Sequence, residues 1–309
     1  MTSVFFDSTF DDEARRQHLY EGDLLVYCPR PSTLAFTEFA RGMIEEAFAP
    51  YDPETAQFEM PVEQFAAILS ELKPSFIHHP RAKQLLQAIF TDFGCELAKT
   101  YFDVPKMRSM AAGDYLRAGI ALAFDPHRDS WFASPLCQQN WWLPIYPIGP
   151  ENCMAFHPHY WSNGVRNGSC DYNQYEWNRV GRKTASQYTR TDNRKIPRPE
   201  EPMELDPQIR LVPPAGGLIM FSGAQMHSTV PNTSGRTRFS IDFRTVHLDD
   251  VAAMRGAPNV DSAPTGTTLW ELMRADDYSR MDESIIRLYD ANPPEEGLVF
   301  EADAVLAAR

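Results

Sequence analysis

Two histidines and one aspartate have the residue types and the spacing of ligands for a single metal ion. His127 and Asp129 are separated by one residue in the segment AFDPHRDSWF, and His227 lies much further along the chain in FSGAQMHSTV. On a β-strand, side chains two residues apart leave the same face about 6.6 Å apart at the backbone. Only a folded sheet brings His227 beside them. Two histidines and one carboxylate leave three coordination positions open on an octahedral ion, which predicts a non-haem Fe(II) site.

A cation and a hydroxyl follow His227 at strand spacing. In HSTVPNTSGRTRFSIDF, Arg238 and Ser240 are two residues apart, so their side chains point the same way on an extended chain. A guanidinium beside a hydroxyl suits a carboxylate through charge-assisted hydrogen bonds. A dicarboxylic keto acid would chelate iron through its keto and adjacent carboxylate oxygens while its far carboxylate reaches Arg238. The pattern therefore predicts 2-oxoglutarate as co-substrate. Arg244 shares this face if the strand continues, and it is the alternative partner for that carboxylate.

With these motifs the chain resembles the Fe(II)/2-oxoglutarate-dependent dioxygenases, and within them the phytanoyl-CoA dioxygenase-like group. The likeness rests on H-x-D at 127–129, the distal His227, R-x-S at 238–240 and the stretch CQQNWWLPIYPIGPENCMAFHPHYW. It covers roughly residues 15–250. The resemblance implies that dioxygen takes the last coordination position, that 2-oxoglutarate yields succinate and carbon dioxide, and that a substrate C–H bond is oxidised. Related halogenases lack a carboxylate at the position of Asp129, so hydroxylation, or a desaturation or ring closure derived from it, is preferred over halogenation.

The same resemblance suggests which other side chains line the site. Trp141 falls where the family has an aromatic residue beside 2-oxoglutarate, and Gln139 is expected in the same place. The side chains expected in the substrate pocket are Trp131, Phe132, His157 and Arg244.

His157 and His159 offer a competing metal pair, because H-x-H is also a strand-spaced signature in cupin-like barrels. Pro158 between them favours a turn at a strand end instead. A cupin-like metalloenzyme that does not use 2-oxoglutarate therefore stays open as an alternative function. A small-molecule binding module on a degenerate oxygenase fold is a second alternative.

The elements that must position these residues change character along the chain. Apolar periodicity predicts helices over about 30–50, 61–72 and 80–99. Short β patterns with intervening Gly and Pro follow, at 115–124, 137–146, 153–157, 209–213, 217–222 and 236–246. This order predicts a mainly β domain with flanking helices (α+β), whose core is a double-stranded β-helix of the jelly-roll or cupin-like kind.

We expect one catalytic domain over 1–309. It comprises a mainly helical part (1–110), a β-helix core (111–250) with an insertion or lid at 159–208, and a helical tail (251–309) that offers a possible homodimer contact. Residues 159–208 are too long for a structureless connection, so we expect them to cover the site.

Composition narrows the class of partner. The net charge of −13 disfavours nucleic acid and anionic membranes, and mildly favours neutral or cationic small molecules. Five cysteines without C-x-x-C spacing, and no signal-peptide or membrane-span pattern, favour a cytoplasmic protein with reduced thiols. We therefore expect a polar small-molecule substrate, in a biosynthetic pathway.

Overall fold

The computed structural model describes residues 2–121, 125–184, 187–188 and 191–300. Its core is a large, almost wholly antiparallel sheet with strand order β1-β2-β8-β5-β10-β3-β11, to which β4 adds by pairing with β10. The strands of this sheet are β1 (Val4–Phe6), β2 (Leu24–Tyr27), β3 (Thr100–Phe102), β4 (Lys106–Met110), β5 (Gln139–Pro144), β8 (Leu218–Ser222), β10 (Arg238–His247) and β11 (Met273–Arg274).

A smaller sheet packs against one face of the large one. Its order is β7-β6-β9, made of β7 (Ile209–Leu211), β6 (Met154–Phe156) and β9 (His227–Thr229). A buried cluster joins the two sheets: Trp142, Ile219 and Phe221 of the large sheet pack with Phe156 and Leu211 of the small one. The face of the large sheet turned toward β6 is called the inner face below.

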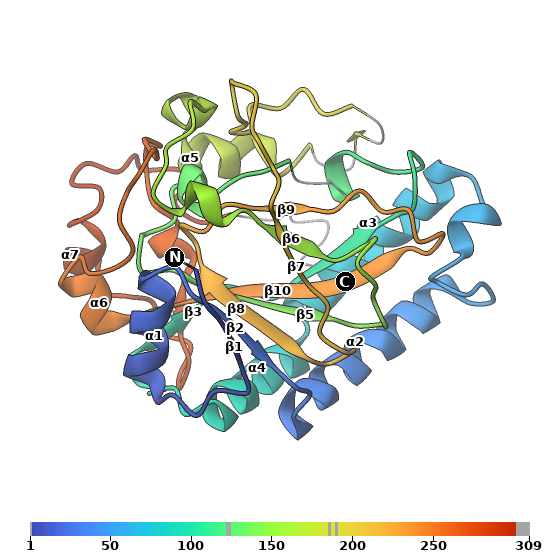
Figure 1. Ribbon diagram of the computed structural model, residues 1–309, viewed down its shortest axis with the longest axis horizontal. Coiled ribbons are helices and arrows are strands. Elements are labelled where there is room, and N and C mark those ends of the chain that lie inside the picture. Colours follow the sequence, from blue (N-terminus) through green and yellow to red (C-terminus); the bar gives the residue numbers. More distant parts are fainter. Residues whose placement is uncertain (1, 122–124, 185–186, 189–190, 301–309) are drawn as a thin grey trace.

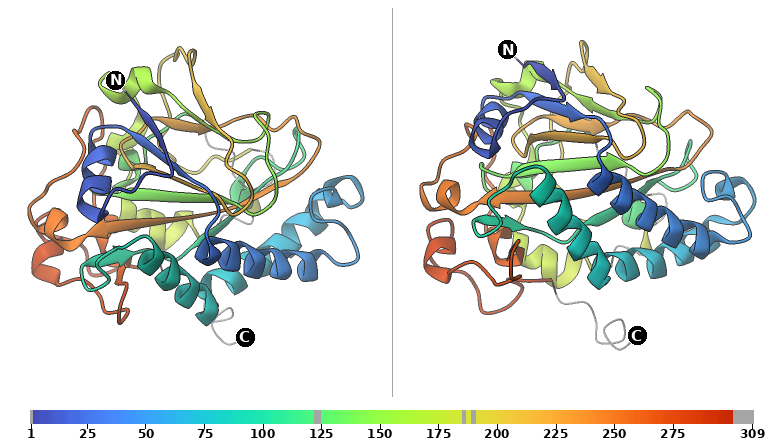
Figure 2. Two further views of the ribbon diagram at one scale, coloured as in Figure 1. Left: turned by 60° about the horizontal axis from the view of Figure 1, so that its bottom comes forward. Right: turned by 90° about the horizontal axis from the view of Figure 1, so that it is seen from below.

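Three long helices cover the opposite, outer face of the large sheet (Figures 1 and 2). They are α2 (Pro31–Phe48), α3 (Val62–His78) and α4 (Pro80–Asp92). Helix α2 begins with Pro31 at its first position, where no backbone N–H is needed, and buries Phe36, Ala40, Ile44 and Phe48 at a spacing of four residues. These side chains pack on the outer faces of β5, β8 and β10. The helices predicted from apolar periodicity are thus present.

The division of the chain into helical and β parts is less clean than predicted. Residues 1–110 hold four strands as well as helices, including α1 (Asp12–Tyr20). Of the tail, residues 251–300 are described, and their regular structure is limited to the end of α6 (Leu248–Ala252), a 3-10 helix (Thr268–Glu271), β11 and α7 (Glu283–Ile286), with irregular stretches between them. The predicted strand at 115–124 is wrong over 115–121, which form a turn and a 3-10 helix, and 122–124 lie outside the described residues.

The 159–208 segment has little regular structure besides short helical turns, such as α5 (Gln174–Glu176). An antiparallel bridge between Asn167 and Pro199 brings together the two ends of the chain stretch between them. The loop between these two residues contacts the C-terminal tail through hydrogen bonds and an ion pair. The contacts join Tyr172 to Thr265, Arg182 to Glu271, Tyr175 to Asp290 and Asn178 to Gly297. All five cysteines are free thiols. Within the described ranges, no helix has the length and apolarity to cross a membrane.

Candidate functional site

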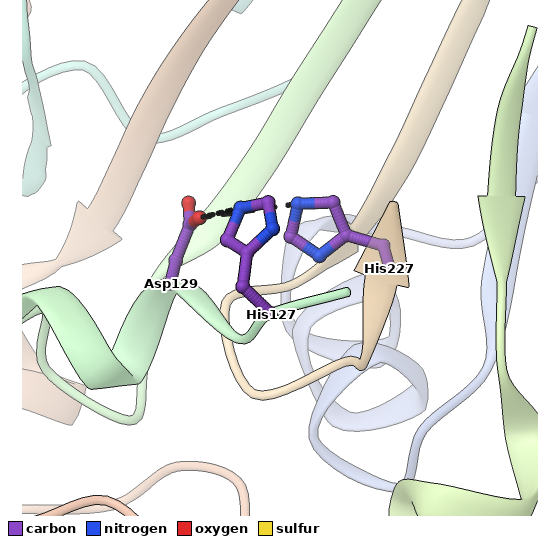
Figure 3. A group of neighbouring side chains, drawn as sticks. All are labelled: His127, Asp129 and His227. Carbon is purple, nitrogen blue, oxygen red and sulfur yellow. Dashed lines mark ion pairs between the residues drawn. The ribbon is translucent and has the colours of Figure 1, made fainter. Parts of the chain in front are cut away.

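The three predicted metal ligands meet at one point on the inner side of the molecule (Figure 3). Asp129 Oδ1 lies 3.5 Å from His127 Nε2 and 3.9 Å from His227 Nε2. Metal–nitrogen and metal–oxygen bonds are about 2.1 Å long, so ligands that share one ion lie no more than about 4.2 Å apart. Both of these pairs meet this limit, and all three ligand atoms lie within 4.8 Å of one another, so this group could hold a metal.

The chain positions His127 differently from the prediction. The expectation that 127–129 form one strand is wrong: His127 makes an isolated antiparallel bridge with His227, through reciprocal N–H···O bonds of 2.9 and 3.0 Å. Asp129 begins a 3-10 helix that ends at Phe132. The bridge places both imidazoles side by side, and the tight turn brings the carboxylate back toward them.

Backbone carbonyls fix the tautomer of both histidines. Nδ1 of His127 lies 2.9 Å from the carbonyl oxygen of Asp125, and Nδ1 of His227 lies 3.0 Å from that of Gln225. A carbonyl oxygen only accepts, so Nδ1 carries the proton in each ring and Nε2 keeps its lone pair for a metal. Burial, with a contribution from His127, lowers the pKa of His227 to about 3. The site therefore presents His227 as a neutral ligand.

Two amides orient the Asp129 carboxylate. Its Oδ2 accepts hydrogen bonds from Gln138 Nε2 at 3.0 Å and Asn140 Nδ2 at 2.9 Å, and Arg244 Nε lies 3.6 Å away. Oδ1 is left facing the histidines. Burial alone would raise the pKa of Asp129, but the polar groups around the carboxylate, including the hydrogen bond from Asn140, outweigh it and lower that pKa. The carboxylate is thus held ionised, as a metal ligand must be.

The central residue of the H-x-D motif is structural, a role that the sequence pattern did not reveal. Arg128 is 1% exposed, and its guanidinium binds both carboxylate oxygens of Asp261 and the carbonyls of Ala224, Tyr160 and Asn163. Asp261 also accepts from Trp131 Nε1 and Val165 N. Arg128 therefore ties the metal-binding segment to the base of the 159–208 cover and to the tail.

Arg238 and Ser240 both lie on the inner face at the start of β10, and both are almost fully buried. Arg238 donates through Nη1 to the carbonyls of Asn152 and Cys153, while its Nε and the Ser240 hydroxyl have no hydrogen-bond partner among the described residues. No carboxylate among the described residues pairs with Arg238, and burial lowers its pKa to about 10. An unpaired buried cation beside an unpaired buried hydroxyl is costly unless an anion binds there.

The side chains predicted on β5 are displaced by one residue. Trp141 packs on the outer face, stacked on Phe243 and against Phe90, and donates to Thr245. Gln139 shares that face, because successive strand residues alternate. Their placement beside 2-oxoglutarate is therefore corrected: Asn140 and Trp142 occupy the inner face, Asn140 bound to Asp129 and Trp142 with its ring 5.5 Å from the Arg238 guanidinium.

Of the two neighbouring aromatic residues predicted in the substrate pocket, Phe132 lies beside the metal ligands and Trp131 does not. Phe132 packs edge-on against His127 at 5.7 Å and against Tyr172 of the cover, so it lies beside the ligand cluster. Trp131 is fully buried and bound to Asp261, which corrects its placement in the pocket.

His157 is buried, and hydrogen bonds hold its imidazole, so it does not line the predicted substrate pocket. Its Nε2 lies 2.9 Å from the Ser228 hydroxyl and its Nδ1 3.3 Å from the carbonyl of Leu205. Its exposed neighbour His159 does not join it in any metal-binding group within the described part of the chain. Arg244 reaches the site, but it pairs with Asp103 at 2.9 Å, so Arg238 is the cation without a carboxylate.

No protein-family model and no curated protein sequence matches the chain. Among solved structures, EvdO2 from Micromonospora carbonacea var. aurantiaca aligns with a TM-score of 0.44 and 10% identity, over 78% of this chain and 92% of that one. The non-haem alpha-ketoglutarate-dependent epimerase SnoN from nogalamycin biosynthesis aligns with a TM-score of 0.38 and 13% identity, over 82% and 96%.

The carbocyclase SnoK from the same biosynthesis aligns with a TM-score of 0.38 and 14% identity, over 77% of this chain and 85% of that one. EvdO2 has been solved with 2-oxoglutarate, and SnoN with Fe3+ and alpha ketoglutarate. These likenesses are distant, so the functional assignment depends on the geometry of the site itself.

Proposed function

We propose that this chain is an Fe(II)- and 2-oxoglutarate-dependent oxygenase that hydroxylates a C–H bond of a polar small metabolite in a biosynthetic pathway. The observation that carries the proposal is the buried pair of Arg238 and Ser240. Arg238 Nε and Ser240 Oγ have no hydrogen-bond partner among the described residues, and both side chains lie on the inner face, which also carries Asn140, the residue that donates to the metal ligand Asp129. A dicarboxylate co-substrate satisfies both groups at one end and reaches the metal at the other.

Each residue then has one task. His127, Asp129 and His227 hold the iron, which supplies the oxygen-activating chemistry when it is bound. Gln138 and Asn140 hold Asp129 so that Oδ1 faces the ion. Arg238 and Ser240 bind the distal carboxylate, and Trp142 covers the guanidinium. The cover at 159–208 keeps water from the site.

Several finer assignments belong to the same proposal. The two facing sheets are proposed to be the halves of a double-stranded β-helix, and the chain to be of the phytanoyl-CoA dioxygenase-like group. Hydroxylation is preferred to halogenation because Asp129 occupies the position that a halide would need. The rival reading, a cupin-like metal site at His157 and His159, is disfavoured because both ring nitrogens of His157 have hydrogen-bond partners.

Titration calorimetry of the anaerobic Fe(II) protein with 2-oxoglutarate tests the proposal. We expect binding in the wild type, a loss of at least about 100-fold in Arg238→Met, and a smaller loss in Ser240→Ala, because a charge-assisted bond exceeds a neutral one. Arg236→Met is the matched control, since Arg236 lies two residues away and its side chain is 61% exposed. Binding that is absent in the wild type, or unchanged in Arg238→Met, would contradict the assignment.

A further inference from the structure

Gln225 contacts the metal ligand His227 through its backbone and the N-terminal part of the chain through its side chain. Its carbonyl oxygen accepts a hydrogen bond from Nδ1–H of His227 at 3.0 Å. Its Nε2 donates to the carbonyl oxygen of Gly22, in the turn after α1, at 2.6 Å. Gln225 is fully buried, and its backbone N–H donates to the carbonyl of Ser222 at the end of β8. The residue that sets the tautomer of His227 is therefore itself held at two points.

The side-chain amide of Gln225 is a poor choice for stability alone. Its Oε1 is buried and has no hydrogen-bond partner within the part of the chain that the structure describes. A buried acceptor without a partner costs free energy, whereas a methionine of similar length would fill the same space without that cost. Natural proteins accept such local costs most often at functional sites. This favours a role for the one hydrogen bond that the amide does make, the bond to Gly22.

The acceptor of that bond lies in a turn that only glycine fits. Gly22 has a φ of +93°, a conformation that residues with a side chain rarely adopt. A Cβ atom at this position would also lie 2.4 Å from Cε2 of Trp161, which belongs to the first residues of the 159–208 cover. Gly22 thus contacts both the cover and the segment that carries His227.

The same end of α1 also contacts the segment that orients Asp129. The hydroxyl of Tyr20, the last residue of α1, lies 3.3 Å from the carbonyl oxygen of Cys137. The next residue, Gln138, donates to Asp129 and accepts a hydrogen bond of 2.9 Å at its own carbonyl from Gly223 N. Gly223 lies two residues before Gln225, so the supports of the two ligands are joined through the backbone.

We propose that Gln225, anchored on the turn after α1, positions His227 for metal binding. The inference rests on the metal site of the proposed function and not on its co-substrate. Gln225 is a positioning residue, because it acts through the hydrogen bond that its carbonyl accepts from His227 Nδ1–H. Such a bond fixes the orientation of the ring and makes its other nitrogen a better metal ligand. The bond to Gly22 keeps that carbonyl in place, which makes the N-terminal segment part of the metal site.

Proton NMR of the Co(II)-loaded protein provides a direct readout. Paramagnetic Co(II) shifts the N–H protons of coordinated imidazoles far from all other signals, so His127 and His227 should give two such exchangeable signals in the wild type. We expect Gln225→Met to shift the His227 signal or to speed its exchange with water, and to leave the His127 signal unchanged. Gln57→Met is the matched control, since Gln57 is a buried glutamine whose amide binds the backbone of Ala112 instead.

Co(II) titrations of the same proteins give the magnitude. We expect Gln225→Met to weaken Co(II) binding by about tenfold, at the lower end of the effect of removing a partner of a metal-binding histidine. Without metal it should unfold at about the wild-type temperature. Loss of folding, or a lower melting temperature with unchanged affinity and both N–H signals intact, would assign Gln225 a purely structural role and overturn the inference. If the wild type itself binds no Co(II), the metal site of the proposed function fails, and the inference with it.

Discussion

At the scale of single residues, the metal ligands depend on neighbours that the sequence pattern does not mark. Asn140 and Gln138 hold one oxygen of Asp129 so that the other faces the histidines. Removing such a partner typically costs 10- to 100-fold in metal affinity. We expect Asn140→Leu to weaken Fe(II) or Mn(II) binding by about this factor, measured by anaerobic titration. Gln139→Met, one residue away on the outer face, should bind metal normally; the opposite ranking would contradict the role of Asn140.

Lys73 gives the protein a specific dependence on pH. Its pKa is lowered from 10.5 to about 7 in the folded state, chiefly by burial. Between these values the unfolded chain binds a proton that the folded chain does not, so stability rises with pH across this window. We expect the free energy of unfolding to increase by roughly 1–3 kcal/mol more in the wild type than in Lys73→Met between about pH 7 and pH 9.5. Urea titrations at both values check this; parallel changes in the two proteins would refute it.

Residue type and spacing were sufficient to select His127, Asp129 and His227, whose ligand atoms the structure brings within 4.8 Å of one another. The assignment of Arg238 and Ser240 to a co-substrate stays a prediction. Arg128, Asn140 and Lys73 were missed for a physical reason. Their behaviour depends on the folded surroundings: that of Arg128 on Asp261, that of Asn140 on the turn that carries Asp129, and the lowered pKa of Lys73 chiefly on burial. No interval in the sequence encodes such contacts.

At the scale of elements, the register of β5 decides which tryptophan serves the site. A shift of one residue exchanges the two faces of a strand, and QQNWWLP is apolar on both faces, so its sequence does not fix the register. The structure puts Trp142 inside and Trp141 outside. Helices were easier to predict, because a stripe with a period near 3.6 extends over many residues whereas most of these strands have three to six.

The two neighbouring tryptophans provide a paired test of that register. Trp142→Leu removes the ring next to the Arg238 guanidinium, so we expect it to weaken 2-oxoglutarate binding by about three- to tenfold. Trp141→Leu removes a ring from the outer core, so it should lower the stability by about 2–4 kcal/mol and leave the affinity for 2-oxoglutarate unchanged. Calorimetry and urea unfolding of both variants separate the effects. The reverse assignment of the two phenotypes would require the opposite register.

At the scale of the whole molecule, the helices and the sheet share one core. Phe36, Phe76 and Phe90 of the helices pack with Trp141 and Phe243 of β5 and β10, and the site is built on the other side of those strands. We therefore expect a single thermal transition, which Mn(II) and 2-oxoglutarate together raise by a few degrees when both are well above their dissociation constants. Scanning calorimetry with and without the ligands measures this. Two separate transitions, with only one shifted by the ligands, would indicate independent units.

The bridge between Asn167 and Pro199 has a consequence for how the protein could be re-engineered. Because the bridge joins the two ends of the intervening loop, a foreign loop can be grafted between them without displacing the strands of the two sheets. The C-terminal tail segments that contact the loop would have to be exchanged together with it. The native loop contacts four residues of the tail: Thr265, Glu271, Asp290 and Gly297. The conformation of the loop therefore depends on the tail. Chimeras that exchange both should keep the group of His127, Asp129 and His227 intact and, under the proposed function, change which substrate binds.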